Sequence, residues 1–248
     1  KAVFDLQDSS QIGLPGALLE SDYYFKRSLT KDTYQGLSSD ESKKLKPFGF
    51  NYQVTLPDKA LTIKRIALEY MSRPFNPLNK KNKFHLHNIK ELIDANWRPG
   101  RSPLMTVNEL LPDRRDHFDY DVLFQCRLWS PKDLAPRNRA DAEKVNKDRI
   151  KLVKALKAEF QDRFIGGLQP TDYAQKLAPD LVVNSRDMAS RRGYISLVKR
   201  SSIVISSAGL LGSNGWKLGE YIALGKAIVS EPLVAEVPGE FKKGVHYK

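Results

Sequence analysis

The stretch from Ser201 to Glu231 constrains the fold of this chain more than any other. It begins with a β-branched run, residues 202–206, of the kind that fills a buried parallel strand. A loop rich in glycine follows, then helical spacing over residues 216–224 and a second apolar run over residues 227–229, with Gly225 at the position of a helix C-cap. This order of strand, loop, helix and strand predicts a βαβ unit in a parallel sheet.

The loop inside this unit has the composition of a phosphate-binding loop. Gly209, Gly212 and Gly215 allow the backbone to approach an oxyanion closely, and the first turn of the next helix offers unpaired N–H groups. Lys217 adds a cation in that turn, and the carboxylate of Glu220 can accept two hydrogen bonds from a ribose diol. An ordinary βαβ turn with a surface glutamate fits the same spacing, so the spacing alone leaves both interpretations open.

The stretch resembles the donor-binding segment in the C-terminal domain of GT-B glycosyltransferases of the group 1 type, which use nucleotide sugars. The matching letters are SIVISS, the glycine-rich loop and KLGEYIALGKAIV, which covers residues 217–229. In that family the glutamate, here Glu220, holds the ribose of the donor, and the loop amides hold its diphosphate. Many retaining members carry a second glutamate eight positions earlier, where this chain has Gly212, so the resemblance leaves the stereochemical outcome open.

The same resemblance extends to residues 118–125, which predict the first strand of a second lobe, and to the segment after it. In the family this strand is followed by an arginine and, a few residues later, a lysine that neutralise the leaving diphosphate; Arg127 and Lys132 match these positions. An arginine fork suits phosphate because it can donate paired hydrogen bonds, although a surface salt bridge is the alternative role for Arg127. The resemblance implies a donor site made of Arg127, Lys132, Gly212, Ser213, Asn214, Gly215, Lys217 and Glu220, with Arg127 and Glu220 catalytic.

The first part of the chain predicts a smaller strand–helix–strand unit, with strands near residues 2–4 and 22–25 and a helical piece at 17–19. Asp8, Lys26 and Arg27 follow the strands directly, at the edge where ligands bind in open α/β sheets. The resemblance makes Asp8 a candidate catalytic base and places Lys26 and Arg27 near an acceptor or phosphate; solvated charge is the simpler alternative. Residues 46–52 predict a turn-rich segment, which resembles the short motif that closes the N-terminal domain in this family.

Further elements are predicted from caps and periodicity. Asp58 is expected to cap a helix over residues 58–71, and residues 84–88 to form a strand with His85 and His87 on one face. No cysteine or third histidine lies near these two in the sequence, so structural or solvent-facing roles are expected. Residues 96–112 predict a loop, and the linker between lobes is expected within residues 98–117. Two later helices are predicted from their periodicity. The first covers residues 138–160, with Ile150, Val153, Leu156 and Phe160 facing inward. The second covers residues 186–200, with Tyr194, Leu197 and Val198 facing inward and a solvated face made of Arg191, Arg192, Lys199 and Arg200.

The charge of the chain favours an anionic partner. Its 248 residues carry a formal net charge of +12, which suits a nucleotide sugar, a lipid phosphate, an acidic membrane surface or nucleic acid. No helix-turn-helix, zinc or aromatic-and-basic ribbon signature is present, so nucleic acid is not expected as a partner. Cys126 is the only cysteine, and no apolar run is long enough to span a bilayer, which predicts a cytoplasmic protein with possible peripheral contact to membrane.

These observations predict an α/β protein with parallel sheets, and the resemblance implies a GT-B-like architecture of two Rossmann-like lobes. Residues 1–117 are expected to form a partial, acceptor-side lobe and linker, and residues 118–248 a nucleotide-sugar-binding lobe truncated at its end. The activity that the resemblance implies is metal-independent glycosyl transfer, of hexosyltransferase type, from a nucleotide sugar to a glycan or lipid-linked acceptor, as in polysaccharide biosynthesis, without a further cofactor. A nucleic-acid-binding protein and a non-catalytic nucleotide-binding protein remain the alternatives.

Overall fold

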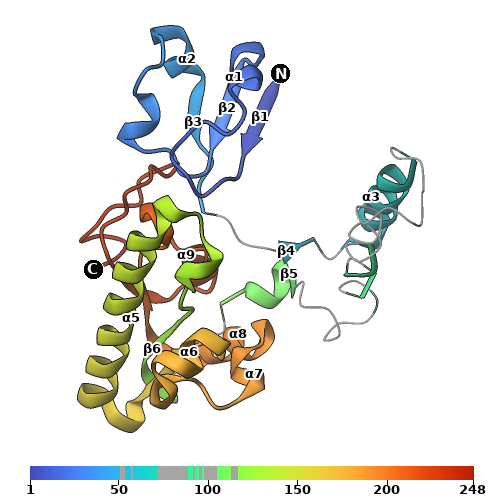
Figure 1. Ribbon diagram of the computed structural model, residues 1–248. Helices are drawn as coiled ribbons and strands as arrows, with labels where there is room; N and C mark the ends of the chain where they lie inside the picture. The colour runs from blue at the N-terminus through green and yellow to red at the C-terminus, as the bar shows by residue number, and fades with distance from the viewer. Residues whose placement is uncertain are drawn as a thin grey trace.

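The structure is a computed structural model that describes residues 1–50, 54–56, 58–71, 89–91, 93–94, 97, 105–112 and 117–248. It shows an α/β protein built on parallel sheets, as the sequence predicts (Figure 1). The predicted strand at residues 84–88, with His85 and His87, lies outside the described residues.

The first sheet has the strand order β1-β2-β3 and is parallel throughout. Its strands are β1 (Ala2–Asp5), β2 (Tyr23–Lys26) and β3 (Leu45–Pro47), connected through α1 (Pro15–Glu20), η1 (Lys31–Tyr34) and α2 (Ser39–Lys44). Leu18, Tyr24, Leu29 and Leu45 form its core on one face. The predicted strand–helix–strand unit is confirmed. The prediction of a turn at residues 46–52 is wrong at its start, because Leu45 is buried and draws residues 45–47 into the sheet.

The second sheet has the order β7-β6-β8-β9 and is also parallel. Its strands are β6 (Tyr120–Cys126), β7 (Phe164–Leu168), β8 (Ser201–Ser206) and β9 (Ala227–Ser230). The predicted strands at residues 118–125, 202–206 and 227–229 are confirmed as β6, β8 and β9 to within two residues at each end. Val122 of the central strand β6 pairs with Phe164 on one side and with Ile203 on the other.

Helices cover both faces of this sheet. They are α5 (Arg139–Phe160), α6 (Asp172–Leu177), α7 (Arg186–Ala189), α8 (Arg191–Arg200) and α9 (Lys217–Ala223). Val122 and Phe124 pack with Val153 of α5 on one face, whereas Leu123 packs with α8 and α9 on the other. Successive side chains of a strand point to opposite faces, so an almost continuous apolar run such as β6 requires cover on both.

The order of the strands creates a topological switch point between β6 and β8. The chain leaves β6 toward β7 on one side and later enters β8 on the other side of β6. The segments that follow β6 and β8 therefore lead to α5 and α9 on opposite faces of the sheet, and they separate at the carboxyl ends of these strands. In open α/β sheets this is where ligands bind.

Two expectations for the helices need correction. The helix predicted over residues 186–200 is interrupted at Ser190, whose hydroxyl accepts a hydrogen bond from the Gly193 amide at 3.0 Å and caps α8. Arg191 and Arg192 do not form a solvated face, because they are ion-paired with Glu220 and Glu109 and their side chains are 19% and 29% exposed. The predicted inward residues Tyr194, Leu197 and Val198 are buried.

The middle of the chain contributes short elements to the second lobe. Strands β4 (Val54–Thr55) and β5 (Met105–Thr106) pair in parallel, and η2 (Val107–Leu110) follows. The expectation of a loop over residues 96–112 is wrong for 105–110, since Met105 and Leu110 are buried in the core under β6 and β8. Helix α3 (Lys59–Met71) confirms the predicted helix, and the Asp58 carboxylate accepts hydrogen bonds from the Ala60 and Leu61 amides.

The segment after β9 returns to the first lobe. The Glu236 amide donates to the Leu29 carbonyl at 2.7 Å, and the Phe241 and Phe50 rings meet edge to face at 5.2 Å. Figure 1 shows this red segment between the two sheets. Among the helices that the structure describes, none has the length and apolar character needed to cross a bilayer.

Candidate functional site

A pocket of about 460 Å³ lies at the switch point between β6 and β8. We call it the switch-point pocket. It combines the ends of both strands, the loop after β8, the start of α9 and one residue of the first lobe. Its polar lining residues are Asp8, Gln125, Arg127, Trp129, Arg149, Gln169, Ser206, Ser207, Ser213, Asn214 and Lys217, with Gly209 and Gly215 in the loop.

Three of these lining residues are cations and one is a carboxylate. Arg127 follows β6, Arg149 projects from α5 and Lys217 begins α9, so the positive groups come from three elements. Asp8 is the single acidic side chain among the described residues that line it. The Cys126 thiol lies buried beside them, and burial raises its pKa to about 11, so it adds no negative charge at neutral pH. The pocket therefore carries an excess of positive charge suited to an anion.

Arg149 holds the two walls of the pocket together. Its guanidinium donates to the Arg127 carbonyl at 2.5 Å, to the Ala208 carbonyl at 2.9 Å and to the Ser207 hydroxyl at 3.2 Å. These bonds tie the segment after β6 to the segment after β8. Burial lowers the pKa of Arg149 from its ordinary value without neutralising it. From the sequence, only an amphipathic helix was predicted here, and nothing in the pattern distinguished Arg149 from the other basic residues of the helix.

Lys217 lies half-buried at the inner end of the pocket. Its ammonium donates to the Gln125 carbonyl at 2.5 Å and lies 3.8 Å from the centroid of the Tyr194 ring. Burial, which disfavours the charged form, lowers the pKa of Lys217 to about 8. Most Lys217 side chains are therefore charged at pH 7, and a nearby anion would favour the charged form further.

Arg127 and the loop residues also line the pocket. The Arg127 guanidinium is exposed and lies 5.1 Å from the centroid of the Trp129 ring. The loop is closed by a hydrogen bond from the Gly209 amide to the Ser213 carbonyl at 2.9 Å. The Asn214 side chain donates to the Ala235 carbonyl at 3.1 Å, so the returning C-terminal segment braces the loop.

Two amides of this loop already bind carboxylates. The Ala208 amide donates to Glu231 at 2.5 Å, and the Leu211 amide donates to Asp141 at 2.7 Å. Gly212 lies next to the recess beside Glu231 and does not line the switch-point pocket. The positive character of the pocket therefore comes from its three cations, beside the backbone around Ser213 and Gly215.

Glu220 lies outside this pocket. Its carboxylate is ion-paired with Arg191 at 2.9 Å, and the side chain is only 12% exposed. Burial raises the pKa of Glu220, against the opposing effect of Arg191 and Lys217. In this structure the carboxylate predicted to hold a ribose is thus engaged by a neighbouring helix instead.

The candidate residues of the first lobe divide into two groups. Lys26 is fully buried and pairs with Asp5 at 3.2 Å inside the first lobe, so it reaches neither pocket nor solvent. Arg27 is also buried, but it joins the lobes: it pairs with Asp8, donates to the Asn214 carbonyl at 3.4 Å and lies 4.5 Å from the Trp216 ring. Only Asp8 of the three lines the switch-point pocket.

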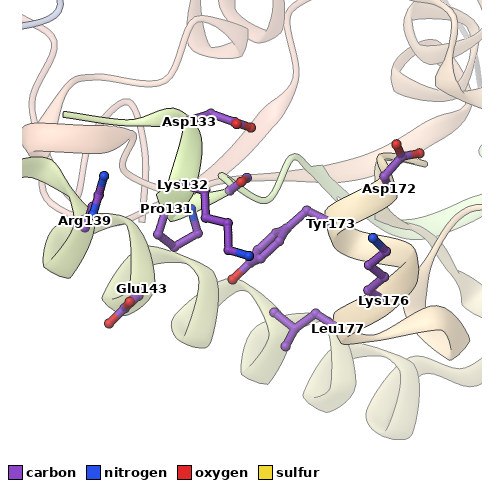
Figure 2. Close-up of a pocket in the computed structure, with 10 residues that line it drawn as sticks. Pro131, Lys132, Asp133, Arg139, Glu143, Asp172, Tyr173, Lys176 and Leu177 are labelled. Carbon is purple, nitrogen blue, oxygen red and sulfur yellow. The ribbon is translucent and has the colours of Figure 1, made fainter. Parts of the chain in front are cut away.

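Lys132 belongs to a different cavity. It lines a groove of about 650 Å³ between η3 (Pro131–Asp133), the start of α5 and α6 (Figure 2). Of the predicted donor-site residues, the structure brings Arg127, Ser213, Asn214, Gly215 and Lys217 together in one pocket and leaves Lys132, Gly212 and Glu220 out of it. Trp129 and Gln169, which also line this pocket, were not among the predicted site residues.

Comparison with known proteins adds no relative: no protein family, curated protein or solved structure matches this chain. Within the described part of the chain, no group of three or more histidine, cysteine or acidic side chains is placed to hold a metal ion. The site is therefore interpreted from its own geometry.

Proposed function

We propose that the switch-point pocket binds the diphosphate of a nucleotide sugar, and that the protein transfers the sugar to a glycan or lipid-linked acceptor. One observation carries the proposal: Arg127, Arg149 and Lys217 converge from three elements on a cavity at the switch point of a parallel sheet. A diphosphate needs such a set of cations and backbone donors. The cavity volume of about 460 Å³ also falls in the range of small-molecule sites.

The geometry suggests distinct roles for these cations. Arg127 is exposed and can make paired hydrogen bonds to phosphate oxygens. Lys217 supplies a charge at the inner end of the pocket, and Arg149 keeps the two walls at a fixed distance. When the glycosidic bond to the donor breaks, the leaving diphosphate gains negative charge, which preorganised cations stabilise without a metal.

A second function, nucleotide binding without catalysis, is favoured by the state of the carboxylates. Asp8, the candidate base, is ion-paired with Arg27, and Glu220 is ion-paired with Arg191. Neither group is an uncommitted base or ribose ligand in this arrangement. Binding without turnover would support this alternative, whereas release of nucleoside diphosphate that depends on Arg127 would support the transferase.

The test uses the whole chain and a panel of UDP-, GDP-, ADP- and dTDP-sugars. At least one should raise the melting temperature, because a ligand that binds only the folded state stabilises it. Arg127→Ala should weaken that binding about tenfold or more, the loss expected for a charge-assisted hydrogen bond. Arg137→Ala is the matched control, because Arg137 is an exposed arginine of η4 (Pro136–Asn138) outside the pocket.

The outcomes separate the alternatives. If no nucleotide sugar raises the melting temperature, or if Arg127→Ala and Arg137→Ala weaken binding equally, the pocket does not hold a donor. Retention on a polynucleotide column that sugar nucleotides do not displace would instead favour a nucleic-acid partner, with the salt dependence typical of phosphate contacts.

A further inference from the structure

The groove that contains Lys132 is large and lies next to the switch-point pocket. Its volume is about 650 Å³, and it is bounded by η3, the first turns of α5 and the helix α6. Trp129 lines the switch-point pocket and the next residue, Ser130, lines this groove, so a single short segment separates the two cavities. We call the second cavity the outer groove.

The outer groove carries balanced charges that do not pair with one another. Its acidic and basic lining residues are Lys132, Arg139 and Lys176 against Asp133, Glu143 and Asp172. Within the described part of the chain, none of these six side chains takes part in an ion pair. The groove therefore offers charged donors and acceptors side by side with no net charge, in contrast to the positive switch-point pocket.

The remaining lining side chains supply an apolar surface between these charges. Figure 2 shows Tyr173 extending from α6 across the groove toward Lys132 and Pro131, with Leu177 one turn further along the same helix. Tyr173 is half-buried, and Leu177 is 50% exposed. Helix α6 is held in place at its start, where the Thr171 hydroxyl accepts from the Ala174 amide at 3.2 Å.

This combination matches the chemistry of a neutral oligosaccharide. A pyranose ring has an apolar C–H face, which packs on an aromatic ring, and a rim of hydroxyls that both donate and accept. Carboxylates accept from such hydroxyls and ammonium or guanidinium groups donate to them, so both kinds of side chain are used. An anionic ligand would meet three carboxylates here, and a cationic one would meet three basic groups.

We propose that the outer groove binds a neutral glycan through stacking on Tyr173 and hydrogen bonds to the charged rim. The glycan would extend past Ser130 and Trp129 to the switch-point pocket, and so present one end to the donor. Its role as an acceptor rests on the proposed transferase function, whereas the binding of a glycan in the groove does not.

The experiment measures binding of maltohexaose, cellohexaose, laminarihexaose and chitohexaose to the whole chain by saturation-transfer NMR. At least one should bind, and Tyr173→Ala should weaken it about tenfold, the loss of one aromatic anchor. Tyr173→Phe should keep the affinity within about twofold, because the ring face remains. Asp172→Asn, which changes the rim and leaves the apolar surface intact, should also weaken binding measurably.

Tyr23→Ala is the matched control, since Tyr23 is an exposed tyrosine on β2, far from the groove in sequence and lining neither cavity. Binding that Tyr23→Ala and Tyr173→Ala reduce equally would overturn the proposal, as would binding of none of the four glycans. Preference for charged peptides over all four glycans would also overturn it. Glycan binding is measured without a nucleotide sugar and donor binding without a glycan, so failure of the donor site and failure of the groove give different results.

Discussion

Lys217 carries its charge in a half-buried position between the Tyr194 ring and the end of β6. Burial lowers its pKa from an ordinary value of 10.5 to about 8, while Cys126 and Glu220 oppose the shift and Arg149 adds to it. Between these two pH values the unfolded chain keeps the proton and the folded chain has lost it. The free energy of unfolding should therefore rise with pH across this window because of Lys217.

Urea unfolding at a series of pH values tests this contribution. Lys217→Met removes the titrating group and fills similar space, so the difference in stability between the native chain and the variant should shift in favour of the native chain from about pH 8 to about pH 10.5. Lys147→Met, at an exposed position on α5, is the matched control. A constant difference between Lys217→Met and the native chain would show that the lysine is not perturbed.

The sequence located part of the switch-point pocket, because some of its residues lie close together along the chain. Ser213, Gly215 and Lys217 follow a predicted strand directly, and Arg127 follows another, so the parallel topology brings them to one edge. Arg149 could not be predicted in this way. It is buried only because the segments after β6 and β8 both pass over α5 and leave carbonyls for it to bind. From the sequence, Glu220 was predicted to contact the ligand. Its ion pair with Arg191 is a tertiary contact, which the sequence pattern does not reveal.

Among the elements, strands were predicted more accurately than helices. The β-branched and apolar runs of β6 and β8 leave no polar face, which only a sheet covered on both sides accommodates. The long α5 was predicted by its period, but the polar residue Asn146 on its buried side was missed. Asn146 exchanges hydrogen bonds with the Trp129 backbone at 2.7 and 2.9 Å, which makes a polar residue acceptable in the core.

The break between α7 and α8 depends on a glycine. A Cβ on Gly193 would lie 1.7 Å from the Asp187 carbonyl oxygen, so α7 can approach α8 only where there is no side chain. Gly193→Ala should destabilise the protein by about 1–3 kcal/mol as the backbone of α7 is displaced. Gly16→Ala in α1 is the control, because a Cβ there meets nothing within 4 Å. This variant should raise the free energy of unfolding by about 0.5–1 kcal/mol.

Thermal and urea unfolding of both variants would measure the expected loss of stability in Gly193→Ala and the expected gain in Gly16→Ala. If Gly193→Ala also stabilised the protein, the close approach of the two helices would not exist in solution, and the single helix predicted from the sequence would be the better description.

At the scale of the whole molecule, the two sheets are joined through a small set of contacts around the switch-point pocket. Arg27 of the first lobe reaches Asn214 and Trp216 of the second, and the C-terminal segment pairs with Leu29 and Phe50. Asp8 lines the same pocket. A ligand in this pocket would thus contact both lobes, so its binding and the contact between the lobes should be coupled.

The contact between Arg27 and Trp216 links the two lobes, so these two side chains should have a measurable coupling energy. The guanidinium lies 4.5 Å from the Trp216 ring and is buried, and burial lowers its pKa to about 10. A cation–π contact away from water contributes about 2 kcal/mol, whereas an exposed one contributes about 0.5–1 kcal/mol. Arg127 and Trp129 form a second pair of the same kind, at 5.1 Å within the second lobe, in which the arginine is exposed and the tryptophan half-buried. Double-mutant cycles with alanine at both pairs, followed by circular dichroism in urea, should therefore give the larger coupling for Arg27 and Trp216. Additive effects for this pair would mean that the lobes are not held together here in solution.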